Sequence, residues 1–181
     1  MIQYVCRDMA QAVRYLPYGL VTGIPTAVIV LLLVNGRRKR IGKVPLKWLP
    51  GVIFGIYFAV LVAITFLSRE SGSRSGVMDL ELFSTWGIND RNNAFVIENV
   101  LLFIPYGFLC SWNFSSARKL FRCALFGAAT SFCIEWLQLV TGRGYFQIDD
   151  ILTNILGTVL GWLLFRLIFA ICSPGRLLSG T

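Results

Sequence analysis

The chain has 181 residues, of which 56% are hydrophobic and only 14% are charged, and its formal net charge is +8. Soluble domains average about 25% charged residues, so this composition argues against an ordinary soluble domain. The chain has no histidine, which excludes His-based catalytic triads and histidine metal ligands. The apolar residues come in runs of about 18 to 22, the length of a helix that crosses a hydrocarbon core of roughly 30 Å. We therefore expect an all-α, polytopic transmembrane helical bundle, with residues 1–181 forming a single domain.

The apolar runs predict five membrane spans, at residues 17–34, 49–68, 95–112, 120–140 and 150–171. Residues 1–16 are amphipathic, and they form either an extracellular N-terminal segment or a short helix lying in the membrane interface. None of the five cysteines belongs to a C-x-x-C pair. Four lie in or beside apolar runs, where cysteine behaves as a small hydrophobe. We therefore expect no disulfide framework, no metal site and no cofactor.

The charges of the connections predict the orientation of the chain in the membrane. The connection at 35–47 carries six basic residues and no acid, and the connection near 118–122 is also basic. In the second connection, between residues 69 and 91, acids outnumber bases, and two aspartates close the fourth connection. Because short basic loops stay in the cytoplasm, we expect the C-terminus to be cytoplasmic and both acidic connections to lie outside. The same bias explains the positive net charge without a nucleic-acid partner.

The second connection becomes amphipathic at MDLELFSTWGI, residues 78–88. One interpretation is a lid that lies on the outer surface, with Leu80, Leu82, Phe83 and Trp86 dipping into the bilayer. The alternative is a solvated loop with a few hydrophobic residues.

Two helix faces carry small and polar residues in otherwise apolar spans. Residues three and four apart share one face of a helix. In the fourth span the stripe is Cys123, Gly127, Ser131 and Glu135, with Gln138 three residues later; in the fifth it is Asp150, Asn154, Gly157 and Gly161. We expect the two stripes to face each other, packed closely at depth and opening outward.

Glu135 lies about one turn below the predicted outer edge, where an unpaired carboxylate is costly. We therefore expect Asn154 or Arg143 to lie within one side chain of it. Structural roles remain open for the other polar residues. Asp149 or Asp150 would cap the fifth helix, Arg143 would mark the interface, and Gln138 and Asn154 would bond neighbouring helices.

Three segments together resemble the VanZ-like family of bacterial membrane proteins. They read ITFLSRESG at 64–72, ENVLLFIPYGFL at 98–109 and IEWLQLVTGRGYFQIDDILTNILGTVLG at 134–161. These match a serine-arginine helix end, N-x-x-x-F-x-P-x-G, E-x-x-Q and R-x-F-D-x-D-D-x-x-x-N-x-x-G, so the family-like core covers about 64–161. Gln147 departs from the pattern, which often has an acid there.

The resemblance implies a multi-pass protein of the bacterial cell membrane with a role in low-level resistance to teicoplanin, a lipoglycopeptide. It implies no catalytic residue, only positions for a ligand-binding site. Those positions are Arg69, Asn99, Glu135, Gln138, Arg143, Asp149, Asp150 and Asn154.

The residues favour an outward-facing, acidic and amphiphilic pocket that binds a lipid headgroup or the lipoglycopeptide. Membrane lipids, and a lipoglycopeptide or lipid-linked cell-wall intermediate, are the expected partners. Two other functions remain open. One is an intramembrane enzyme on lipid-linked substrates, with Glu135 and Asp149 or Asp150 as acid and base. The other is a flippase-like transporter of a polar lipid.

Overall fold

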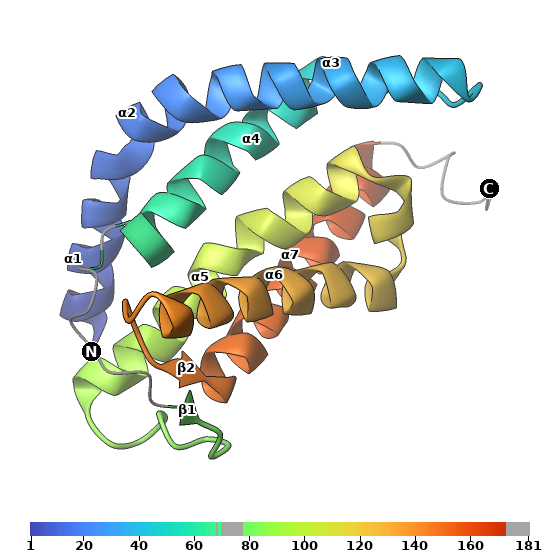
Figure 1. The fold of residues 1–181 in the computed structure, drawn as a ribbon. Coiled ribbons are helices and arrows are strands. Elements are labelled where there is room, and N and C mark those ends of the chain that lie inside the picture. Colours follow the sequence, from blue (N-terminus) through green and yellow to red (C-terminus); the bar gives the residue numbers. More distant parts are fainter. Residues whose placement is uncertain (68, 70–77, 173–181) are drawn as a thin grey trace.

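The computed structural model describes residues 1–67, 69 and 78–172. The chain is almost entirely helical within these limits (Figure 1). Its helices and strands are α1 (Ile2–Ala12), η1 (Val13–Tyr15), α2 (Leu16–Tyr18), η2 (Gly19–Gly23), α3 (Ile24–Arg40), α4 (Trp48–Val62), η3 (Ala63–Leu67), β1 (Met78–Asp79), α5 (Asp90–Asn113), η4 (Ser115–Arg118), α6 (Leu120–Val140), β2 (Phe146–Gln147) and α7 (Ile148–Cys172).

Five helical stretches of the described chain are long and apolar enough to cross a membrane. They are Ile2–Arg40, Trp48–Leu67, Asp90–Asn113, Leu120–Val140 and Ile148–Cys172. The five predicted spans are therefore confirmed, with boundaries within a few residues for the last four. The first stretch extends far beyond the predicted 17–34, because residues 2–16 continue the helix toward the N-terminus.

The N-terminal arm, residues 2–40, bends at α2 and η2, so that α1 turns away from the line of α3 (Figure 1). The bend coincides with Pro17, whose ring removes a backbone hydrogen bond, and with a π-helical turn between Gly19 and Gly23. Beyond the bend, α1 packs against the start of α5. Asp8 accepts a hydrogen bond from the Arg91 guanidinium there. Residues 1–16 are therefore docked on the helix bundle.

Helices α5, α6 and α7 form the bundle that carries most of the buried core, with α4 packed on α5. Phe103 of α5 and Leu61 of α4 are fully buried in this core. The hydroxyl of Tyr57 in α4 donates to the Leu102 carbonyl at 2.7 Å, and the hydroxyl of Tyr106 in α5 lies 2.6 Å from Thr130 Oγ1 in α6. These bonds satisfy polar groups inside the apolar bundle, where water is excluded.

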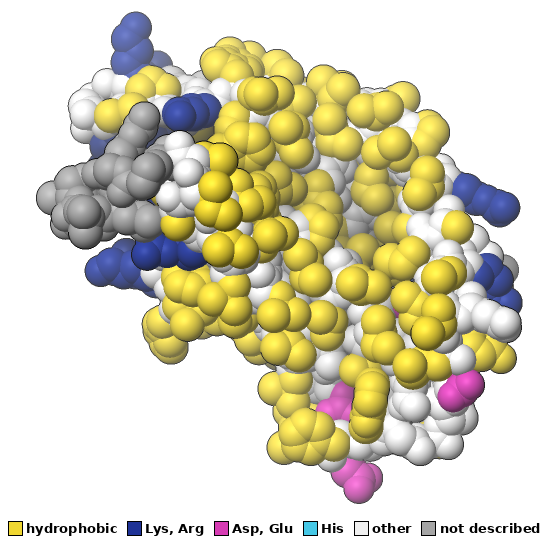
Figure 2. Space-filling view, turned by 180° about the vertical axis from the view of Figure 1, so that it is seen from behind, with side chains coloured by type: hydrophobic (Ala, Val, Ile, Leu, Met, Phe, Trp, Pro, Cys, Tyr) yellow, Lys and Arg dark blue, Asp and Glu magenta, His cyan; other side chains and the backbone are white. Residues whose placement is uncertain are grey.

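The charges divide the molecule into two ends. We name the acidic end by its connections 78–89 and 141–147, and the basic end by its connections 41–47 and 114–119. In Figure 2, hydrophobic side chains cover most of the visible face, and acidic side chains gather at its lower end. That is the end at which β1 and β2 lie in Figure 1. The surface has the banded pattern expected of a protein with lipid around its middle.

Candidate functional site

A cavity of about 670 Å³ opens at the acidic end of the bundle. Helices α5 and α7, strands β1 and β2, the end of η3 and the two acidic-end connections supply its walls. The sequence-predicted site residues in its lining are Arg69, Asn99, Arg143 and Asp150. Asp79, Ser84, Asn92, Phe95 and Tyr145 line it as well. The lining therefore combines both signs of charge, amides, a hydroxyl and aromatic rings.

Asp150 projects into this cavity from the first turn of α7. Asn99 Nδ2 of α5 donates a hydrogen bond to its carboxylate at 2.8 Å. An acid in the first turn is stabilised by the positive end of the helix macrodipole. The cross-helix hydrogen bond fixes the Asp150 carboxylate against α5.

Glu135 lies directly behind the cavity wall, with only 3% of its surface exposed. Its carboxylate accepts the backbone N–H of Gln147 at 3.1 Å. It lies near enough to Asp150 for the two carboxylates to repel each other, and near enough to Arg69 for attraction. Glu135 and Asp150 thus form a carboxylate pair that shares one neighbouring cation.

Strand β2 supplies the partner of Glu135 through a short parallel pairing with β1. Met78 pairs with Phe146, and Asp79 pairs with Gln147. We expected Asn154 or Arg143 to lie within one side chain of Glu135; the hydrogen bond that the structure shows comes from the Gln147 amide, which we did not predict. Sequence periodicity could not indicate this contact, because a two-residue strand carries no repeating pattern.

Arg143 joins the connection between α6 and α7 to the end of η3. Its Nη1 donates to the carbonyl oxygens of Phe66 at 3.1 Å and Arg69 at 2.9 Å, and its guanidinium lies 4.8 Å from the centre of the Phe66 ring. The connection itself is a Schellman turn that ends α6. Gly142 has φ +63°, and the N–H of Arg143 donates to the Gln138 carbonyl at 2.8 Å.

Gln138 is buried and bonds α6 to η3, because its Nε2 donates to the Thr65 carbonyl at 2.6 Å. Arg69 passes close to it. A Cβ added at Gly144 would lie 2.7 Å from Arg69 Nη1 and 3.2 Å from Gln138 Oε1. Gly144 therefore leaves the space through which the Arg69 guanidinium reaches the cavity.

Asp149, the neighbour of Asp150, is buried and binds the outer connection. One carboxylate oxygen accepts the backbone N–H of Phe83 at 2.7 Å, and the other accepts that of Thr85 at 3.0 Å. We call residues 78–88 the lid. The apolar lid residues proposed to face the bilayer, Leu80, Leu82, Phe83 and Trp86, are all more than half exposed. Asp149 thus holds the lid over the acidic end of the bundle.

The stripe of α7 contacts two helices, of which we predicted only the contact with α6. Asn154 Nδ2 donates to Ser131 Oγ of α6 at 2.8 Å, as the stripe prediction requires. Gly157 and Gly161 pack against α5 instead, where an added Cβ at Gly161 would lie 2.0 Å from the Ile104 carbonyl oxygen. At about 100° per residue, Asp150, Gly157 and Gly161 lie within about 40° of one another and meet α5, whereas Asn154 lies at the edge of the stripe and meets α6.

The eight predicted site residues therefore separate into three groups. The first group lines the cavity and consists of Arg69, Asn99, Arg143 and Asp150. The second is Glu135, which is buried behind the cavity wall and accepts a hydrogen bond from the lining residue Gln147. The third group connects parts of the fold by hydrogen bonds: Gln138 bonds to η3, Asp149 to the lid and Asn154 to α6. Sequence reasoning missed Asp79 as a lining residue, although its place in an acidic outer connection was a signal. In the described part of the chain, no three acidic or cysteine side chains converge as a metal site requires.

Every predicted site residue lies within residues 54–169, which match the sequence profile of the VanZ/LLP1 family. The chain belongs to the VanZ/LLP1 family. Over 124 residues this VanZ-family protein is 31% identical to Protein VanZ of Enterococcus faecium, an alignment that covers 68% of each chain. No solved structure matches the chain. Family membership and the five apolar helices together identify a multi-span membrane protein.

Proposed function

We propose that the cavity at the acidic end faces the outside of the cell and binds the polar part of a membrane amphiphile. The ligand is a lipid headgroup or a lipoglycopeptide, and binding protects the cell against teicoplanin. The observation that carries this proposal is the cavity of about 670 Å³ in which charged and aromatic side chains meet beneath an apolar lid. The similarity to Protein VanZ supports the antibiotic part of the proposal.

The lining matches the chemistry of such a ligand. The carboxylates of Asp79 and Asp150 accept hydrogen bonds from sugar hydroxyls or from an ammonium group. The planar guanidinium of Arg69 binds phosphate or carboxylate with two parallel hydrogen bonds. Phe95 and Tyr145 add apolar and stacking surface in the same cavity. A ligand with both a charged or sugar-bearing head and an apolar part uses all of these groups.

The lid supports an amphiphile rather than a fully polar solute. Phe83 and Trp86 are 75% and 54% exposed, beside a cavity whose other walls carry charge. A tryptophan ring at the headgroup level of a bilayer is favourable because one end is apolar and the other is polar. A bound acyl tail would lie along these side chains, which would hold the drug away from its site of action.

One observation keeps the enzyme hypothesis as a second candidate. Glu135 and Asp150 lie near enough to influence each other electrostatically, and paired carboxylates in different environments can serve as acid and base. A transporter that carries protons on Glu135 would use the same pair. Product formation from a lipid-linked substrate favours the enzyme, and dependence on a proton gradient favours transport. Stabilisation by teicoplanin without turnover favours the binding function.

The test replaces each acid by its amide. We expect Glu135→Gln and Asp150→Asn to abolish protection against teicoplanin while membrane abundance stays within about twofold of wild type, because both changes preserve shape and remove charge. The matched control is Glu81→Gln, an exposed acid at the same end that lies outside the cavity. Teicoplanin susceptibility and membrane abundance are measured in the same cells. Full protection by both amide variants would refute the proposed site.

A further inference from the structure

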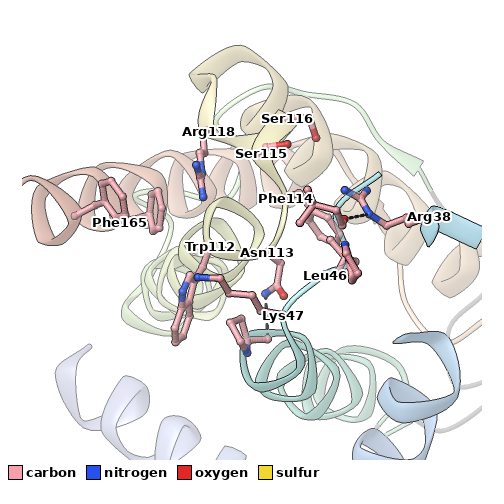
Figure 3. A pocket seen from close by; sticks show the side chains of 14 residues that line it. Arg38, Leu46, Lys47, Trp112, Asn113, Phe114, Ser115, Ser116, Arg118 and Phe165 are labelled. Carbon is pink, nitrogen blue, oxygen red and sulfur yellow. Dashed lines mark hydrogen bonds between the residues drawn. The ribbon is translucent and has the colours of Figure 1, made fainter. Parts of the chain in front are cut away.

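A second cavity, of about 320 Å³, lies at the basic end of the bundle. It is bounded by the connection between α3 and α4, the corner between α5 and α6, and the second half of α7. Figure 3 shows Arg38, Lys47 and Arg118 around it. Arg38 and Lys47 belong to the region of the connection between α3 and α4, and Arg118 belongs to the corner between α5 and α6. The hydroxyls of Ser115 and Ser116 also line it. This cavity is separate from the site proposed above, which lies at the opposite end.

The charge around this cavity has one sign. No aspartate or glutamate occurs at residues 9–69, 99–134 or 151–181 of the sequence. Within the described residues, no carboxylate pairs with the side chains of Arg38, Lys47 or Arg118. Cations that share a cavity repel one another unless an anion lies between them. Within the described part of the chain, the cavity therefore has the electrostatics of an anion site.

The fold holds these cations in place. Arg38 Nε donates to the Val44 carbonyl at 2.6 Å, which fixes the Arg38 side chain against the connection between α3 and α4. The connection that carries Lys47 is fixed by Asn35, whose side chain exchanges two hydrogen bonds with the Leu46 backbone at 2.6 and 3.1 Å. An ordered connection of this kind loses less conformational entropy when it binds a ligand than a flexible loop does.

The third cation is anchored by α7. The Trp162 indole donates to the Arg118 carbonyl at 3.0 Å, and the Arg118 guanidinium lies 5.9 Å from the centre of the Phe169 ring. The corner that precedes it is tied to α4, because Asn113 Nδ2 donates to the Pro50 carbonyl at 3.0 Å (Figure 3). The hydrogen bonds of all three regions are thus arranged around one cavity.

We propose that this basic cavity binds the phosphate of an anionic phospholipid headgroup, with the acyl chains lying along the adjacent helices. Arg38, Lys47 and Arg118 would contact the phosphate, and Ser115 and Ser116 would donate hydroxyl hydrogen bonds. Basic pockets between transmembrane helices on the cytoplasmic side are suited to anionic lipid headgroups.

Aromatic lining favours a lipid over a free phosphate ion. Trp112, Phe165 and Phe169 form part of the same cavity. Leu49, at the neighbouring start of α4, is 67% exposed on a helix suited to span the membrane. Apolar surface next to a phosphate site offers nothing to inorganic phosphate, but it is favourable for the glycerol and acyl portions of a lipid. The cavity therefore combines the two chemistries of a phospholipid.

Native mass spectrometry of the full chain in detergent, titrated with dioleoyl phosphatidylglycerol or dioleoyl phosphatidylcholine, tests the proposal. We expect wild type to prefer phosphatidylglycerol, and the double variant Arg38→Gln/Arg118→Gln to bind it roughly tenfold more weakly or worse. The matched control is Arg37→Gln/Arg122→Gln, which removes the same charge from exposed residues at the same end outside the cavity lining. The control is expected to change affinity by no more than about twofold, because exposed charges away from a site contribute little.

Three results would overturn the proposal. The first is equal binding of the two lipids by wild type. The second is a loss of phosphatidylglycerol affinity in the control variant Arg37→Gln/Arg122→Gln as large as that in Arg38→Gln/Arg118→Gln. The third is displacement of the bound lipid by inorganic phosphate at the same concentration. Lys47→Gln gives a second, single-site test if the double variant does not fold. Arg69→Gln, in the acidic-end cavity, separates this inference from the proposed function. If Arg69→Gln lost as much phosphatidylglycerol affinity as Arg38→Gln/Arg118→Gln does, the anionic lipid site would not be at the basic end.

Discussion

Asp149 and Asp150 are neighbours in the sequence, yet their carboxylates bind different parts of the structure. Asp150 faces the acidic-end cavity and accepts a hydrogen bond from Asn99, whereas both oxygens of Asp149 accept backbone N–H groups of the lid. Consecutive residues on a helix lie about 100° apart, so one side chain points to α5 and the other to the connection. The pair therefore couples the ligand cavity to the segment that covers it.

We predict that Asp149→Asn loosens the lid without removing a cavity charge. The amide keeps one acceptor oxygen but turns a donor group toward a backbone N–H, and hydrogen bonds to a charged group are worth about 1.5–3 kcal/mol each. Amide hydrogen exchange at Phe83 and Thr85 should accelerate roughly tenfold or more. Asp150→Asn is the matched control, because its carboxylate does not contact these amides. Unchanged exchange in the Asp149 variant would show that the lid is held by other contacts.

At the level of the site, the sequence predicted which residues gather at one end better than it predicted their partners. Glu135, Asp150 and Arg69 do come together, and hydropathy, charge and the family resemblance were sufficient for that. The hydrogen-bond donor to Glu135 was not predicted, because the position of the Gln147 amide depends on a two-residue strand in which Gln147 pairs with Asp79. Backbone contacts between short segments far apart in sequence have no signature in composition or periodicity.

At the scale of elements, α7 is the centre of the bundle because it packs closely on two helices at once. Gly157 and Gly161 meet the backbone of α5, and Thr158 fills the space opposite Gly127 of α6. Small residues permit such close approach in a membrane, where packing rather than the hydrophobic effect drives helix association. The close approach positions Asp150 beside Asn99 at the acidic end, so packing at depth supports the geometry of the site.

We predict that Gly161→Ala destabilises the protein by about 1–3 kcal/mol, as overpacking of a close contact does. An added Cβ would lie 2.0 Å from the Ile104 carbonyl oxygen and 2.8 Å from the Phe108 nitrogen, so the helices must separate. The control is Gly36→Ala in α3, where nothing lies within 4 Å of the added Cβ. Thermal unfolding in detergent measures both. An equal or higher unfolding midpoint for Gly161→Ala would contradict the α5–α7 contact.

The helices themselves were the most predictable feature, since four of five spans agree with the apolar runs to within a few residues. The fusion of residues 2–16 to the first span was not predicted, because Arg7, Asp8 and Arg14 interrupt the apolar run and Pro17 is typical of a helix start. The structure keeps the helix by packing α1 on α5, where Asp8 and Arg91 pair. Tertiary contacts of this kind override local propensity.

For the molecule as a whole, the main asymmetry is one of charge. Acids and the proposed ligand cavity occupy one end, and a cluster of cations occupies the other. The N-terminal arm lies outside residues 54–169, yet it contacts α5 near the acidic end, so it is an addition to the matched core rather than part of it. The two proposed sites require opposite faces of the membrane, and both depend on the orientation of the chain.

We predict that the basic end is cytoplasmic and the acidic end extracellular. Six basic residues and no acid occupy 35–47, and such loops remain on the cytoplasmic side. The test is cysteine labelling of intact cells in a background from which Cys6, Cys110, Cys123, Cys133 and Cys172 have been removed. A cysteine at Gly42 should react with an impermeant maleimide only after the membrane is opened. A cysteine at exposed Glu81 in the lid should react in intact cells. Labelling of the Gly42 position from outside would invert the topology. It would also move the proposed drug-binding cavity to the cytoplasmic side, where it could not intercept an extracellular antibiotic.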